Sequence, residues 1–456
     1  MKITAILRAG LFAPLFLSFM LGFSSANAQE IRKLTLEECI DIALNNNISV
    51  QRARNDALMA SSNKKQALLN FLPSLQARAN YNNRTGTFWD ENAARQVSDV
   101  TSTSSPNINA GLLIFNGLRN HHNKKQRNNE YNASNYAVEG TKQTVKTNVI
   151  AFYLNLAADK ENIKISEGRL ALLTRQLERE EKREQAGVGQ IEEVYNLRSQ
   201  VANEKLNLVT LKNTYERDRL LLIQALQLEN VQNIDISDLE ISDQEIEQQI
   251  ESYQNVIDKV MVTSPDLKSA SYSLEASKNA LNVARADRYP TITVFGEIGS
   301  SYSSNGARNP ATGELDPDAS LMDQLEFNEY EGAFFSLNIP LFNRGLTNNN
   351  IQIAKINMVN AKLDLKQAEL DLTNAVQQAY LDLINAKGTY DAAKENLIAL
   401  EQSFKFMASR YNAGNSDFYA YLESLNNKNR AEMELNNARY SIALRKKILN
   451  ILQGLE

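Results

Sequence analysis

The second half of the chain repeats the first, and this duplication limits the possible folds more than any other feature. Phe115-Asn116 recurs as Phe342-Asn343, 227 positions later (342 − 115). Closer to the start, Leu72-Pro73 matches Tyr289-Pro290 at a spacing of 217 (289 − 72), so the second half carries ten additional residues between these matches. The period far exceeds the roughly 20–50 residues of solenoid repeats. The sequence therefore predicts one architecture that is built twice.

The duplication and the start of the chain together suggest four consecutive parts. We expect a signal peptide at 1–28, a first repeat at 29–230, a linker at 231–247 and a second repeat at 248–456. Lys2 and Arg8 precede an apolar run that ends near Ala26-Asn27-Ala28, a pattern typical of a signal peptide and its cleavage site. The mature chain is therefore expected to leave the cytoplasm.

Each repeat contains two segments in which apolar and polar residues alternate. We expect strands at about 74–82 and 107–115 in the first repeat, and at about 291–301 and 331–342 in the second. Their apolar face includes Leu112, Ile292, Val294 and Leu337. Alternation over about ten residues is typical of membrane β-barrel strands, although a small soluble sheet gives the same pattern. The polar stretches 82–106 and 302–330 between the strands are expected to be loops.

A long helical region follows each pair of strands. It contains no proline, and it runs from about Leu118 to Gln185 and from Leu346 to Asn412. A helix of this length spans about 100 Å and must pack in a bundle with other helices. Glycine-containing turns then reverse the chain into a second helix. The turn residues are Gly187, Val188 and Gly189 in the first hairpin, and Gly414, Asn415 and Ser416 in the second.

Composition argues against several classes of protein. The formal net charge is −5, whereas nucleic-acid binding requires a concentrated basic face. Cys39 is the only cysteine, and neighbouring His121 and His122 point about 100° apart on a helix, so neither a disulfide nor a metal site is expected. No phosphate-binding loop or nucleophile motif is present, so we expect neither an enzyme nor a cofactor. The mature chain also has no apolar run long enough for a transmembrane helix.

The duplicated order of strands and hairpins resembles the TolC-type outer-membrane efflux proteins over about Leu34 to Leu452. The fragments that carry this resemblance are Ala43-Leu44 with Asn45-Asn46-Asn47, Leu113-Ile114-Phe115-Asn116-Gly117, Ile339-Pro340-Leu341-Phe342-Asn343-Arg344-Gly345 and Arg410-Tyr411-Asn412-Ala413-Gly414. The resemblance implies a mainly α fold with a membrane β-barrel. Three chains together form the 12-stranded barrel, which continues into a periplasmic tunnel of helices.

The need to close the sheet in lipid points to the same assembly. Four strands cannot close a barrel, and an open sheet edge is not tolerated in lipid. Two chains supply eight strands and a filled interior, whereas three supply twelve and leave room for solutes, so a channel favours three. Gln76, Arg78 and Asn80 are then expected to face the water-filled lumen.

The resemblance also implies a site at the hairpin tips. The tunnel entrance, or gate, matches Glu193, Glu423 and Tyr411 by position, while a further acidic residue and an arginine of the family correspond to Ala420 and Ser416. The tips are expected to contact a periplasmic adaptor (membrane fusion) protein, and the adaptor an inner-membrane transporter. A ring of carboxylates in a narrow tunnel favours cations. An equal alternative is that these carboxylates are simply exposed on a solvated helix end.

These features predict an outer-membrane channel of a tripartite efflux pump or of a type I secretion system. It would be located in the cell outer membrane, in contact with lipid, and extend into the periplasm. The alternative is a periplasmic helical-hairpin adaptor or structural protein of an export complex. Adaptors have one main hairpin and compact β modules, whereas this chain has two hairpins and four isolated amphipathic strands.

Overall fold

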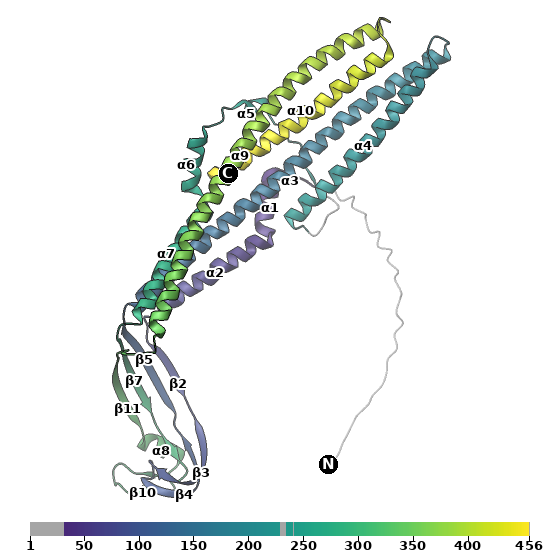
Figure 1. Cartoon of the computed structure of the whole chain (residues 1–456). Coiled ribbons are helices and arrows are strands. Elements are labelled where there is room, and N and C mark those ends of the chain that lie inside the picture. The colour runs from purple at the N-terminus through teal and green to yellow at the C-terminus, as the bar shows by residue number, and fades with distance from the viewer. Residues whose placement is uncertain (1–31, 229–233, 240, 456) are drawn as a thin grey trace, which may run out of the picture.

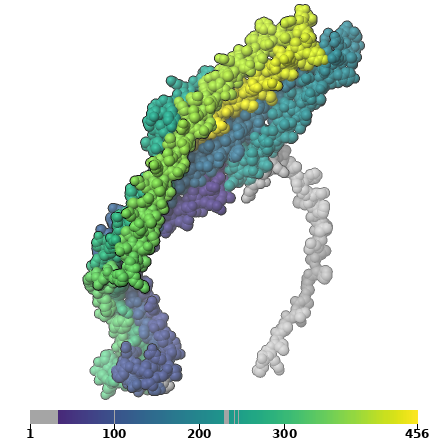
Figure 2. Space-filling view, in the orientation of Figure 1, coloured from purple at the N-terminus to yellow at the C-terminus, as the bar shows by residue number. Residues whose placement is uncertain are grey.

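The computed structural model describes residues 32–228, 234–239 and 241–455. The strands lie at one end of an elongated molecule and the tips of two helical hairpins lie at the other (Figures 1 and 2). The predicted signal peptide at 1–28 lies outside the described residues, as do residues 229–233 and 240 in and beside the predicted linker.

Long helices lie side by side to form most of the molecule (Figure 1). Nearest the strands the neighbours follow the order α2, α3, α7, α9, and toward the tips the order is α4, α3, α10, α9. Their bounds are α2 Ile48–Leu69, α3 Arg119–Gln185, α4 Ile191–Leu226, α7 Pro265–Ala286, α9 Leu346–Asn412 and α10 Phe418–Gln453. Both α3 and α9 contain 67 residues, which confirms the two long helices predicted from the sequence.

Shorter helices flank this bundle. They are α1 Leu36–Asn46, α5 Asp243–Glu247 and α6 Tyr253–Thr263, whereas α8 Leu321–Phe327 lies at the strand end of the molecule (Figure 1). Thr35 and Glu38 form a reciprocal capping box at the start of α1. The chain then turns at Asn47, whose side-chain oxygen accepts a hydrogen bond of 2.8 Å from the backbone N–H of Ser49 and so caps α2.

The four main strands form one antiparallel sheet in the order β11, β7, β5, β2. Their bounds are β2 Ser74–Arg78, β5 Asn107–Asn116, β7 Thr291–Gly299 and β11 Tyr330–Asn338. Residues paired across the strands share a face, so the register separates an apolar face from a polar one. The apolar face carries Leu75, Ala77, Ile108, Ala110, Leu112, Ile292, Val294, Ile298, Ala333, Phe335 and Leu337. The polar face carries Ser74, Gln76, Arg78, Asn107, Asn109, Thr293, Glu297, Ser336 and Asn338 together with the apolar Leu113, Phe295 and Phe334, and Glu331 falls on the apolar face.

The strand ends differ from the predicted ranges. β2 ends at Arg78, so Asn80 lies outside the sheet, between two strands. β11 ends at Asn338 rather than 342, and Pro340, which has no N–H to donate to a ladder, follows closely. An irregularity in pairing between Leu113 and Phe115 places Phe115 rather than Ile114 opposite Ile292.

The predicted loops contain additional strands. Residues 82–106 hold most of a long hairpin, β3 Tyr81–Asp90 and β4 Arg95–Ser104, and β4 also pairs with β8 Tyr302–Ser303. Two further short strands, β9 Ala307–Arg308 and β10 Leu315–Asp316, pair in the second loop. The carboxylate of Asp90 is buried and accepts hydrogen bonds from Ser303 at 2.6 Å and Asn305 at 2.8 Å. The two loops therefore pack as one unit.

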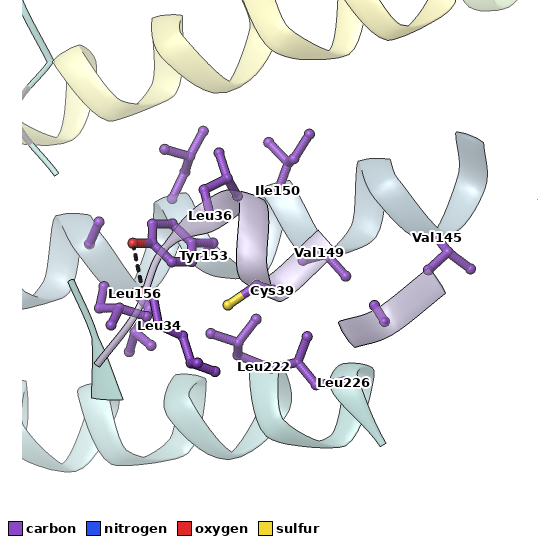
Figure 3. Close-up of a cluster of buried hydrophobic side chains, with 14 of the residues drawn as sticks. Leu34, Leu36, Cys39, Val145, Val149, Ile150, Tyr153, Leu156, Leu222 and Leu226 are labelled. Atoms are coloured by element: carbon purple, nitrogen blue, oxygen red, sulfur yellow. Dashed lines mark hydrogen bonds between the residues drawn. The ribbon is translucent and has the colours of Figure 1, made fainter. Parts of the chain in front are cut away.

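The largest core cluster lies where α1, α3 and α4 meet (Figure 3). Tyr153 is buried there, and its hydroxyl group donates toward the backbone oxygens of Leu34 and Ser237, each at 3.2 Å. These acceptors flank a two-stranded parallel sheet, β1 Arg32–Leu34 and β6 Ile234–Ile236. Part of the predicted linker 231–247 is therefore paired to the start of the first repeat and supplies the buried Ile236 to its core.

Candidate functional site at the hairpin tips

The first hairpin reverses at a glycine turn between α3 and α4. Gly187 has φ +71°, a conformation that glycine adopts without steric cost. Its N–H donates to the oxygen of Glu184 at 2.9 Å, and the N–H of Val188 donates to Arg183 at 3.0 Å. These two bonds define a Schellman motif, which satisfies the last carbonyl groups of α3. A Cβ atom added to Gly189 would lie 2.6 Å from the backbone of Glu184, so this position also requires glycine.

The second hairpin reproduces the same turn between α9 and α10. Gly414 has φ +77°, and its N–H donates to the oxygen of Tyr411 at 3.0 Å. The N–H of Asn415 donates to the oxygen of Arg410 at 2.9 Å. Ser416 donates its hydroxyl hydrogen to the sulfur of Met407 at 3.1 Å, so it does not act as a charged partner in the tip. The two tips therefore share one backbone geometry with different side chains.

A buried carboxylate, Glu180, lies between the two hairpins near their tips. Its side chain is 2% exposed, and it pairs with Arg183 at 2.8 Å and Arg179 at 3.2 Å. Tyr411 of the other hairpin donates its hydroxyl hydrogen to Glu180 at 3.5 Å and stacks on Tyr421 with ring centroids 4.9 Å apart. Since a buried charge is costly unless it is paired, Glu180 holds these groups together.

A second contact joins the tips closer to their ends. Tyr419, in the first turn of α10, donates its hydroxyl hydrogen to Glu192 of α4 at 2.7 Å. Asn196 donates to the Tyr419 oxygen at 2.9 Å. The tips of one chain are therefore joined by two separate sets of polar contacts.

The predicted gate residues occupy different environments. Glu193 is half-buried, and burial followed by the charge of Glu180 raises the pKa of its carboxyl group. Burial and then Glu180 and Glu193 raise the pKa of Tyr411 to about 12, so its hydroxyl group is protonated at neutral pH. Glu423 is exposed on α10. The structure thus brings Glu193 and Tyr411 together around Glu180, whereas Glu423 takes no part in this cluster.

Sequence reasoning missed Glu180, which is central to the cluster. It lies in a run of charged residues, where most side chains are solvated. The duplication offered a signal, because the corresponding position in the second half is Met407 (407 − 180 = 227). This signal does not single out Glu180, because the neighbouring Arg179 and Glu181 also match apolar residues, Phe406 and Ala408. Val188, in contrast, is exposed at the tip as expected.

The polar face of the sheet contains two of the three residues predicted to line a lumen. Gln76 pairs with Asn109 and Arg78 with Asn107. Asn107 in turn donates to Glu297 at 3.5 Å. Asn80, the third of these residues, lies beyond the end of β2 and therefore does not belong to the polar face of the sheet.

Within the described residues, no group of three or more His, Cys, Asp and Glu side chains is placed to hold a metal ion. Cys39 is buried in the core cluster of Figure 3, and burial raises the pKa of its thiol to about 12. No helix in the described part of the chain combines the length and apolarity that a membrane span requires.

Comparison with known proteins identifies the family. The family model described as "Outer membrane efflux protein" matches residues 39–227 and 256–452. The outer membrane protein TolC of Vibrio cholerae is 25% identical over 458 residues, covering 96% of this chain and 93% of the relative.

Solved structures share the fold at lower identity. The Campylobacter jejuni CmeC outer membrane channel is 18% identical, with a TM-score of 0.73 over 92% of this chain and 85% of that one. The open state of the Neisseria gonorrhoeae MtrE outer membrane channel is also 18% identical, with a TM-score of 0.71 over 92% and 89%. The resemblance found in the sequence is thus confirmed, and the adaptor alternative is set aside. The chain belongs to the outer membrane efflux protein family.

Proposed function

We propose that three copies of this outer-membrane efflux channel close one 12-stranded barrel, which continues into a tunnel formed by the helices. The observation that carries the proposal is the four-stranded sheet with two free edges, β2 and β11. An unpaired edge is not tolerated in lipid, so these edges must be paired. Because β11 and β2 run in opposite directions, β11 of one chain can pair with β2 of the next in the same antiparallel pattern.

The two faces of the sheet support a barrel with a wet interior. The apolar face has aliphatic and aromatic side chains and suits contact with lipid. The polar face, with Gln76 and Arg78, suits a water-filled lumen. This separation is expected of strands between hydrocarbon and an aqueous channel.

Among the described residues, the edges of the helical layer also expose apolar side chains. α9 exposes an apolar row near the strands, composed of Leu346, Ile353, Ile356, Val359, Leu363 and Leu370. On the opposite edge, α2 exposes Ile48, Leu58 and Met59. The α9 row has intervals of three, four and seven residues, which are typical of helices that pack against another helix. We assign these rows to the contact between neighbouring copies.

The transport path follows from this assembly. Solutes enter between the hairpin tips, pass along the tunnel and leave through the barrel. The turns at Gly187–Gly189 and Gly414–Ser416 present the contact surface for a periplasmic adaptor, which connects the channel to an inner-membrane transporter. Glu193 and Tyr411 act at the constricted entrance, together with Glu180.

Disulfide cross-linking between the free edges tests the barrel. Gln76→Cys should be combined, one at a time, with Cys at Gly332, Phe334 or Ser336, since all these positions lie on the polar face. At least one pair should give dimers and trimers on a non-reducing gel, while each single variant should give neither trimers nor the same dimer. The native Cys39 is buried and contributes little background. Monomers alone with every pair would contradict closure between β2 and β11.

A further inference from the structure

A basic pocket lies beside the membrane end of the helical bundle. It has a volume of about 590 Å³ and opens between α2, α3 and α7. Its lining includes Lys64, Leu68, Lys124, Lys125, Asn128 and Asn279. We propose that this pocket binds the phosphate of an anionic phospholipid headgroup at the periplasmic surface of the outer membrane.

The charges in the pocket are not balanced by acids. Among the described residues, none of the three lysines forms a salt bridge, although Lys64 lies 4.5 Å from the ring centroid of Tyr131. Glu275 is the only carboxylate in the lining, and it pairs with Lys278 at 2.6 Å. Three unpaired ammonium groups with asparagine amides nearby are suited to the oxygens of a phosphate.

The pocket lies at the depth of lipid headgroups. β5 ends at Asn116 and α3 begins at Arg119, so Lys124 follows the start of the helix by about 8 Å. Lysines immediately next to a membrane attract anionic lipid, and pockets of this kind between helices bind phospholipid headgroups.

The pocket also lies on the outer side of the helical layer. Arg119 lines a different cavity together with Leu113 and Thr291, which are on the polar face of the sheet. Asn128 follows Arg119 by nine residues, or two and a half helical turns, and therefore faces the opposite side. If the polar face lines the lumen, the lysines face the lipid side. Both the headgroup depth of the pocket and this assignment of the outer side rest on the proposed barrel.

Exposed apolar residues next to the lysines favour a lipid over free phosphate. Leu68 lines the pocket, and Leu69, Phe71 and Leu72 are exposed between it and the start of β2. An acyl chain can cover these side chains while the headgroup contacts the lysines, which inorganic phosphate cannot do.

Binding of a fluorescent phosphatidylglycerol to the purified full-length protein in detergent tests the proposal. K124Q/K125Q should bind this lipid about 30-fold more weakly than the unchanged protein. The matched control K205Q/K405Q neutralises two exposed lysines outside the pocket and should change binding by less than about twofold. K124R/K125R keeps both charges and should retain binding, which separates loss of charge from loss of folding.

Three outcomes would overturn the proposal. The first is unchanged binding in K124Q/K125Q, and the second is equally tight binding of zwitterionic phosphatidylcholine. The third is displacement of the lipid by inorganic phosphate at millimolar concentration, which would indicate a site for free anions. None of these results affects closure of the barrel, because cross-linking between β2 and β11 tests that separately.

Discussion

Tyr411 donates its hydroxyl hydrogen to the Oε1 atom of Glu180 at 3.5 Å and so joins the second hairpin to the first. The acceptor is almost fully buried and is also paired with Arg179 and Arg183. This contact crosses from α9 to α3 near the tips of the hairpins. Its removal should therefore loosen the tips without disturbing the core cluster around Tyr153.

Tyr411→Phe should increase conductance through the channel. The substitution removes one hydrogen bond to a charged group, worth about 1 kcal/mol at this long distance, but keeps the ring that stacks on Tyr421. Single-channel recording in planar bilayers should show a larger or longer-lived open state. Tyr195→Phe is the control, because Tyr195 is exposed at the start of α4. Equal behaviour of the two variants would argue against a role for Tyr411 in gating.

Gly187→Pro or Gly414→Pro should abolish export while the protein still assembles in the outer membrane. Both glycines have positive φ, whereas proline is fixed near −65° and lacks the N–H that each turn uses. Export assays and cross-linking of the tips to the adaptor measure the effect. Gly187→Asn and Gly414→Asn should retain activity, since asparagine tolerates this conformation. Normal export by both proline variants would show that the tips are not the docking surface.

Arginine should be tolerated on one face of β7 and not on the other. Val294 is paired with Leu112 and Phe335 on the apolar face, while its neighbour Thr293 is paired with Ser336 on the polar face. Arginine in contact with mid-membrane lipid costs about 2–4 kcal/mol. Val294→Arg should therefore reduce the assembled, heat-modifiable protein in outer-membrane fractions far more than Thr293→Arg. Similar losses would mean that the two faces are assigned incorrectly.

Glu193→Gln combined with Glu423→Gln should lower the preference for cations and weaken block by divalent ions. The effect should come mainly from Glu193, because Glu423 is exposed outside the Glu180 cluster. Burial and the charge of Glu180 raise the pKa of Glu193. As the pH is lowered, the preference for cations should therefore begin to fall at a higher pH than with an ordinary glutamate. Reversal potentials of the single and double variants across pH measure this. Unchanged selectivity would place both carboxylates on the outer face of the tips.

Asp159→Asn should stabilise the protein at neutral pH. Its carboxyl group hydrogen-bonds Asp218, and burial followed by the charge of Asp218 raises its pKa to about 6. In the unfolded chain the value is about 3.9, so the folded state holds an additional proton between these values and stability falls as pH rises through that window. At pH 7.5 the variant should gain about 1 kcal/mol, after allowance for partial exposure, and little at pH 4.

Thermal unfolding at the two pH values measures the Asp159 effect. Asp364→Asn is the control, since Asp364 is exposed on α9 and should not change the pH dependence. A variant at Asp159 that is equally stabilised at both pH values would exclude the titration of this carboxyl group as the cause.

The long helices were predictable because their ends carry strong local signals. The αL glycines at 187 and 414 and the absence of proline determined α3 and α9 almost to the residue. The β3–β4 hairpin was missed because both of its faces are mostly polar and exposed, so it has no apolar alternation.

The candidate site was predictable only in part. Tip position and turn geometry follow from local sequence, whereas the Glu180 cluster depends on which side of α3 faces the second hairpin. That orientation is set by packing between segments more than 200 residues apart. Asn80 was wrongly placed in the sheet, because a regular alternation of polar and apolar residues does not reveal where pairing between strands ends.

The difference between Glu180 and Met407 breaks the symmetry that the duplication created. In the proposed trimer, six hairpins form the tip ring, and its six joints are of two kinds. Three joints lie within a chain and contain the Glu180 contacts with Tyr411. The other three join neighbouring chains, and there the α9 side has Met407 at the matching position and no counterpart of Glu180. Such a ring would open by the movement of three rigid pairs of hairpins, one pair from each chain, rather than of six independent hairpins.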